Sequence, residues 1–77
     1  MKETFDLQAQ EHIALCDLLK IVGVSESGGQ AKSMIQDGLV LRNGEVETRK
    51  TAKIKAGEVV TLPEFDAVIH VTKTELA

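Results

Sequence analysis

Apolar residues recur with helical spacing in the first half of the chain. Four of them fall at positions i, i+3, i+4 and i+7 and would share one face of a helix: Leu15, Leu18, Leu19 and Val22. Gly23 is expected to end this helix, because glycine adopts the left-handed conformation after a helix without a Cβ clash. The pattern therefore predicts a short helix with one buried face.

A second helix is predicted over about residues 27–37. Ser27 can cap it, because its hydroxyl can accept a hydrogen bond from a backbone N–H of the first turn. Gln30 lies three residues on, where its side chain can reciprocate and complete a capping box. The apolar face of this helix is formed by Ala31, Met34 and Ile35.

Asn43-Gly44 predicts a hairpin directly after the second helix, between strands at residues 39–42 and 45–48. This dipeptide suits a type I′ turn because both residues accept a positive φ. Arg42 and Glu45 flank the turn and are expected to pair across it.

The rest of the chain contains further strand patterns rich in β-branched residues. They predict strands at residues 58–62 and 67–71, each preceded by a turn, and residues 4–7 fit a short edge strand. The tail from Thr72 is expected to fray. Two helices followed by a run of strands indicate an α+β fold, with two short helices packed on a small, mainly antiparallel sheet.

Length and composition are those of one globular domain spanning residues 1–77, with 43% hydrophobic and 27% charged residues. No apolar run is long enough to cross a bilayer, and the N-terminus lacks the regions of a signal peptide. Cys16 is the only cysteine, so it cannot form an internal disulfide, and its apolar surroundings predict a small buried hydrophobe. We expect a monomer in the cytoplasm.

Charge is distributed unevenly along a chain whose net charge is −3. Four basic residues and no acids lie between residues 48 and 57, whereas residues 6–17 contain three acids and no Lys or Arg. Such polarity can orient a small protein on a polyanion such as a nucleic acid. A solvated loop with clustered charges is an equally good explanation when the pattern is taken alone.

Candidate chemistry is sparse, and we expect no enzyme, no cofactor and no metal site. His12 and Cys16 would share a helix face only if the first helix began early, and no third residue completes a catalytic group. Phe5 and Phe65 are the only aromatic residues, so a platform for stacking single-stranded bases is not expected. Shape and backbone recognition of a folded nucleic acid fits this composition better.

The span from Ala14 to about Val60 resembles the RNA-binding domain typified by small-subunit ribosomal protein S4, also called the alpha-L motif. The family's pattern is matched in order and without a gap at Ser27, Ala31-Lys32, Met34-Ile35, Gly38, Val40 and Asn43-Gly44. The whole chain is also similar to free-standing bacterial proteins of the YbcJ type. The resemblance implies an RNA-binding core at residues 14–60 and binding of structured RNA, with ribosomal RNA or a ribonucleoprotein as candidate partners.

The predicted RNA-binding surface combines the open first turn of the second helix with basic residues beyond it: Ser27, Gly28, Gly29, Gln30, Lys32, Arg42, Arg49, Lys50, Lys53 and Lys55. The resemblance carries Lys32 over directly, and the free N–H groups and dipole of a helix start also favour an anion. Gly28 and Gly29 would let a phosphate approach closely. The alternatives are that these glycines serve helix packing and that Lys32 is merely solvated.

Some positions depart from the family pattern. Ala14 and Gly28 stand where basic residues are common, Cys16 where an acid is common, and Arg42 where an apolar residue is common. The RNA surface of the family is therefore thinned in this chain. This leaves a second hypothesis, a protein–protein adaptor that kept the fold and lost much of the RNA surface.

Overall fold

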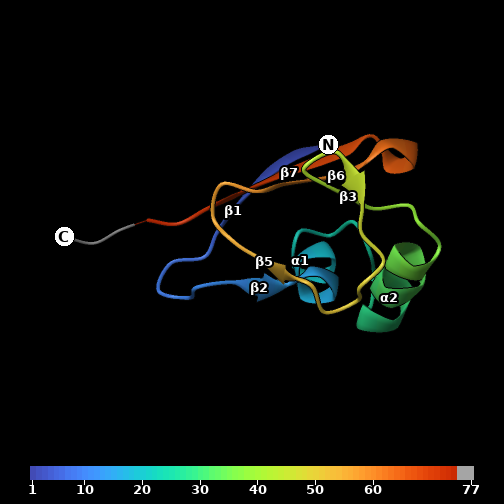
Figure 1. Cartoon of the computed structure of the whole chain (residues 1–77), viewed down its shortest axis with the longest axis horizontal. Coiled ribbons are helices and arrows are strands. Elements are labelled where there is room, and N and C mark those ends of the chain that lie inside the picture. The colour runs from blue at the N-terminus through green and yellow to red at the C-terminus, as the bar shows by residue number, and fades with distance from the viewer. Residues whose placement is uncertain (75–77) are drawn as a thin grey trace.

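The computed structural model describes residues 1–74 of the chain, and Figure 1 shows its arrangement. In chain order, the elements are β1 (Lys2–Asp6), β2 (Ile13–Ala14), α1 (Leu15–Ile21), α2 (Gly28–Gln36), β3 (Leu41–Arg42), β4 (Glu45–Val46), β5 (Lys53–Ile54), β6 (Val59–Leu62), the 3-10 helix η1 (Pro63–Phe65) and β7 (Ala67–Thr72). The predicted α+β class is confirmed.

The strands form two sheets on opposite sides of the core. The larger sheet has the order β1-β7-β6-β3-β4, and all its pairs are antiparallel except β1 with β7, which is parallel. The smaller sheet consists of β2 and β5, paired antiparallel. In Figure 1 the larger sheet lies above, and the two helices lie below it beside the smaller sheet. The edge strand predicted at residues 4–7 is confirmed as β1, which begins earlier, at Lys2, and ends at Asp6.

Helix α1 follows β2 with no residue between them, and it ends just before Gly23, as the sequence predicted. Gly23 has a φ of +86°, and the N–H of Val22 still donates to the carbonyl of Leu18. At its start α1 has no side-chain cap. His12 lies outside the helix and is exposed, whereas Cys16 is buried, so the early start that would have joined them on one helix face does not occur.

Helix α2 begins as predicted, with one difference in its cap. Ser27 Oγ accepts a hydrogen bond from the N–H of Gln30 at 3.1 Å. The side chain of Gln30 accepts from the N–H of Glu26 at 2.6 Å rather than from Ser27. The reciprocal bond of the capping box is therefore shifted one residue toward the N-terminus.

The core is a continuous apolar cluster between the helices and the larger sheet. Its largest fully buried side chains come from all parts of the chain: Leu15, Leu18, Leu19, Ile35, Val40, Ile54, Val60, Leu62, Ile69 and Val71. Cys16 is buried at the edge of this cluster, as predicted. The tail is more ordered than predicted as far as it is described, because Thr72 ends β7 and Thr74 donates to Asp6. The predicted fraying of residues 75–77 falls outside the described residues.

Candidate nucleic-acid interface

The basic segment, residues 49–55, leaves the hairpin and crosses the start of α1. Its carbonyl groups accept hydrogen bonds from the first two N–H groups of that helix. The N–H of Leu15 donates to the carbonyl of Ala52 at 2.9 Å, and the N–H of Cys16 donates to the carbonyl of Lys50 at 3.1 Å. These N–H groups have no partner inside a helix, so the basic segment takes the role that a capping side chain would have. This contact holds the backbone of the segment in place.

Apolar side chains of the basic segment pack into the core and leave its lysines facing solvent. Ala52 is 5% exposed and Ile54 is fully buried, so Ile54 is the main anchor of the segment. Lys53 and Lys55 flank Ile54 and are exposed, because successive side chains of a strand point to opposite faces. Lys50 is exposed as well, and within residues 1–74 none of these three lysines takes part in an ion pair.

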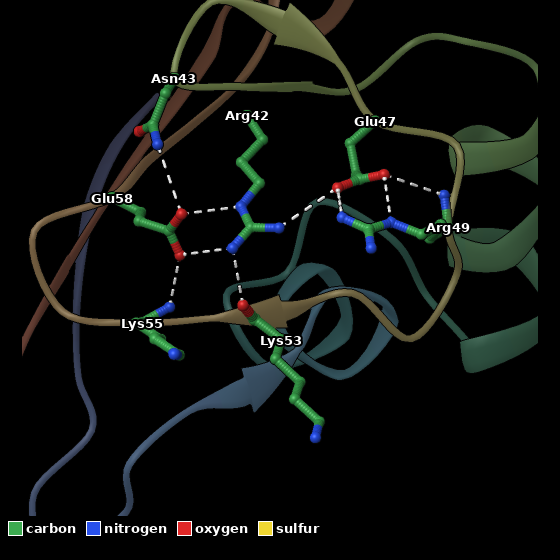
Figure 2. A network of polar contacts seen from close by, with 7 residues as sticks. All are labelled: Arg42, Asn43, Glu47, Arg49, Lys53, Lys55 and Glu58. Atoms are coloured by element: carbon green, nitrogen blue, oxygen red, sulfur yellow. Dashed lines mark hydrogen bonds and ion pairs between the residues drawn. The ribbon is translucent and has the colours of Figure 1, made fainter.

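Arg42 joins the hairpin to the basic segment, as Figure 2 shows. Its Nε and Nη2 donate to the two carboxylate oxygens of Glu58 at 2.8 and 3.0 Å, which is a bidentate pair. Its Nη2 also donates to the backbone carbonyl of Lys53 at 2.8 Å. Side chains of Arg42 and Glu58 are only 21% and 19% exposed, so this contact is a structural brace.

Glu58 and the hairpin turn form the far side of this brace. Glu58 also accepts from the N–H of Lys55 at 2.6 Å and from Asn43 Nδ2 at 3.3 Å. Asn43 Oδ1 in turn accepts from the N–H of Val59 at 2.9 Å. Burial raises the pKa of Glu58, but the hydrogen bonds from Arg42, Lys55 and Asn43 outweigh it, so its pKa lies below the ordinary value.

Glu47 lies between the two arginines, and its side chain is only 11% exposed. Its carboxylate accepts a hydrogen bond from Nη1 of Arg42 at 3.3 Å. On the other side it accepts hydrogen bonds from Nε and Nη2 of Arg49 at 3.1 and 3.0 Å. The hydrogen bond from the Arg49 side chain is the largest of the effects that lower the pKa of Glu47 to about 2. Glu47 is therefore ionised at neutral pH.

These contacts change the expected charge pattern in two ways. The backbone pairs Arg42 with Glu45 across the turn, but the Arg42 side chain binds Glu47 and Glu58, so the predicted Arg42–Glu45 pair is wrong. Although no acid interrupts the basic segment in the sequence, the carboxylates that flank it fold back onto the arginines. Positive charge without a partner among residues 1–74 therefore comes from the lysines in this region.

Two open hollows adjoin this network. The larger, of about 500 Å³, is lined by Arg42, Arg49, Thr51, Ala52, Lys53 and Lys55. The smaller, of about 360 Å³, lies along the hairpin and shares both arginines with it. The structure thus brings Arg42, Arg49, Lys53 and Lys55 to one surface depression.

The first turn of α2 is the other predicted contact. Gln30 and Lys32 are exposed, and the N–H groups of Gly28 and Gly29 take part in no hydrogen bond with residues 1–74. A Cβ atom at Gly28 would meet nothing within 4 Å, and one at Gly29 only the Ser27 hydroxyl at 3.9 Å. Packing therefore does not require glycine at either position.

Sequence reasoning missed the acids Glu47 and Glu58 and the amide of Asn43 as parts of this surface. The available signal was their position, because Glu47 is the nearest acid before the basic segment and Glu58 is the nearest acid after it. Residues 1–74 contain no group of three or more His, Cys, Asp or Glu side chains that could hold a metal ion. None of the helices in this part of the chain is long and apolar enough to span a bilayer.

A pair of helices followed by an Asn-Gly hairpin is the arrangement expected of an alpha-L RNA-binding domain. The family model of the S4 domain matches residues 5–71, so the chain belongs to the S4 domain family. This is a family of RNA-binding domains and not of enzymes, and the predicted resemblance is confirmed.

Particular relatives are bacterial. The chain is 55% identical over 58 residues to "Putative RNA-binding protein YbcJ" of Escherichia coli strain K12, which covers 75% of this chain and 83% of that protein. It is 38% identical over 55 residues to "Probable ribosome maturation protein RlbA" of Bacillus subtilis strain 168, which covers 71% of this chain and 78% of that protein.

A solved structure agrees with the fold. The solution structure of YbcJ from E. coli, described as revealing an alpha-L motif involved in RNA binding, matches with a TM-score of 0.69 and 48% identity. The match covers 90% of this chain and 85% of that one. The alpha-L fold is thereby established for this chain.

Proposed function

We propose that this chain is a small stand-alone module that binds structured RNA through backbone and shape contacts. The observation that carries the proposal is the exposure of Lys50, Lys53 and Lys55 without ion pairs among residues 1–74, on a backbone braced from both sides. Fixed cations at defined spacing suit a phosphate backbone, because phosphate contacts position a protein on a nucleic acid. The family to which the chain belongs supports RNA as the polyanion.

The open start of α2 is proposed as a second phosphate contact. The unbonded N–H groups of Gly28 and Gly29, with Ser27, Gln30 and Lys32 beside them, have the chemistry of an anion site at a helix N-terminus. Arg42 is assigned a positioning role, since its donors are directed to Glu47, Glu58 and Lys53.

Ribosomal RNA or a ribonucleoprotein is the proposed target, in the cytoplasm and with the protein as a monomer. The name of the B. subtilis relative, which refers to ribosome maturation, supports this choice. The aromatic content supports folded RNA over single strands, because Phe5 is half-buried and Phe65 is the only exposed aromatic residue of the chain.

Salt dependence of binding tests the proposal. A stem-loop RNA and an unpaired strand of the same length would be titrated with the protein between about 50 and about 200 mM salt. Four lysine contacts, from Lys32, Lys50, Lys53 and Lys55, predict a slope of about −3.6 for log K against log salt on the stem-loop, with weaker binding of the unpaired strand. Binding that is independent of salt would refute the proposal. If binding weakens with salt as predicted, crosslinking in cells would identify the RNA.

The adaptor hypothesis also has an observation in its favour. Val46 is 59% exposed on the edge strand β4, beside arginines whose charges are cancelled by Glu47 and Glu58. An exposed apolar residue next to a neutralised surface suits a protein partner better than a phosphate. In the same RNA titration an adaptor would show no salt-dependent binding of the stem-loop, whereas the RNA-binding module would.

A further inference from the structure

We infer that Glu47 is an internal competitor for phosphate: its carboxylate occupies the edge of the Arg49 guanidinium that an RNA phosphate would otherwise bind, and so limits affinity. This inference rests on the proposed RNA-binding function. It assigns to an acid of the hairpin the role of setting how many of the basic residues are available to RNA.

The geometry of the Arg49–Glu47 contact is that of phosphate recognition. Nε and Nη2 of Arg49 donate to the two carboxylate oxygens at 3.1 and 3.0 Å, and the Arg49 backbone N–H adds a third bond at 3.2 Å. The fork of N–H groups in a guanidinium fits the paired oxygens of carboxylate and phosphate equally. A phosphate could therefore use this edge only if the carboxylate left it.

Glu47 is held in place while Arg49 is open to solvent. The Glu47 side chain is 11% exposed and also receives Nη1 of Arg42, whereas the Arg49 side chain is 73% exposed. Arg49 lines the same hollow as Lys53 and Lys55. Its guanidinium therefore lies where a phosphate would approach. The carboxylate thus cancels the guanidinium that is best placed to meet a ligand.

Protonation does not relieve this competition at neutral pH. The pKa of Glu47 is lowered to about 2, chiefly by the hydrogen bond from the Arg49 side chain, so the carboxylate keeps its charge. By contrast, Lys50, Lys53 and Lys55 have no ion pair within residues 1–74. The free energy of RNA binding should therefore come from the lysines, and Arg49 should contribute only when Glu47 no longer pairs with it.

The test compares Glu47→Gln with Glu45→Gln, using a stem-loop RNA whose binding by the wild-type protein is measured first. Both substitutions remove one negative charge from the hairpin, but Glu45 is exposed and has no ion pair among residues 1–74. Glu47→Gln should release Arg49, tighten binding about five- to tenfold near 0.1 M salt and steepen the salt slope by about one unit. Glu45→Gln should leave the slope unchanged.

Two further variants keep the net charge of the wild type. In Glu47→Gln with Arg49→Gln, both partners are removed together, and affinity and slope should stay at wild-type values because the pair contributes nothing to binding. Arg49→Lys keeps both charges and the contacts of Arg42, so it is the variant with the least effect on the fold. It should not weaken binding, since a lysine is held less firmly by the carboxylate.

The outcomes separate this inference from the proposed function. Equal effects of Glu47→Gln and Glu45→Gln would overturn the inference, as would a severalfold loss of affinity in Arg49→Lys or a slope flattened by one unit in the double variant. Circular dichroism melts check that each variant is folded, and if Glu47→Gln is not, Arg49→Lys decides. A wild-type protein without salt-dependent RNA binding would refute the proposed function itself, and the inference with it.

Discussion

Replacing Arg42 by Gln should destabilise the fold far more than the same change at Arg49. Arg42 makes three hydrogen bonds to carboxylates and one to the carbonyl of Lys53, and its loss leaves Glu58 without a cationic partner. Hydrogen bonds to charged groups contribute about 1.5–3 kcal/mol each, and removing one partner of a buried pair costs about 3–5 kcal/mol.

Two features of the structure reduce this cost. The Arg42 and Glu58 side chains are 21% and 19% exposed, so water can solvate part of what is lost, and Glu47 keeps Arg49 as a partner. We therefore expect Arg42→Gln to lower the free energy of unfolding by about 2–3 kcal/mol. A domain of this size has a total of about 4–12 kcal/mol, so the loss would be a large fraction of its stability.

Urea unfolding at pH 7 measures this effect. With a slope of about 1 kcal/mol per M for a small domain, the midpoint should fall by about 2–3 M. Arg49→Gln is the matched control, and its midpoint should change much less because its side chain is 73% exposed. A double-mutant cycle of Arg42→Gln with Glu58→Gln should give a coupling above about 1 kcal/mol. Equal and small shifts for Arg42→Gln and Arg49→Gln would refute the view that Arg42 braces the fold.

Further predictions concern pH, α2 and the lysines. The pKa of Glu47 is lowered from 4.5 to about 2, so Glu47 stabilises the fold fully above about pH 5, and this contribution should be lost as the pH falls through about 2. Melting temperatures measured against pH should show the loss. In Glu47→Gln the melting temperature should depend less on pH. Gly28→Ala should raise the stability of α2 by about 0.5–1 kcal/mol because the new Cβ meets nothing, and a lower melting temperature would contradict this. Lys50→Gln should flatten the salt slope of RNA binding by about one unit, whereas Lys20→Gln, an exposed lysine on α1, should change it less.

Local signals were enough to predict the helices and turns. Ser27 caps α2 through the N–H of Gln30, Gly23 ends α1 with a positive φ, and the pair at the hairpin turn has φ values of 52° and 86°. Each of these features depends on atoms that are close together in the chain. The same holds for Ile54, whose burial between two exposed lysines follows from strand alternation.

The candidate site was predicted only as a set of positive charges. The sequence placed the basic residues correctly on an exposed segment, but it did not reveal that Arg42 and Arg49 are paired with Glu47 and Glu58. Arg42 and Glu58 are 16 positions apart, and which acid an arginine meets depends on which strands are neighbours. Strand neighbours are set by the burial of apolar residues across the whole chain.

By itself, the sequence determined the two helices, the hairpin turn, the longer strands, the family and the position of the basic segment. The tertiary structure alone decided that β1 lies parallel to β7 at the far end of the chain, that carbonyls of Lys50 and Ala52 cap α1, and that two of the basic side chains are neutralised. The physical reason is range: steric and capping preferences act over a few residues. Ion pairs and sheet neighbours are selected by the packing of a core whose members are remote in sequence.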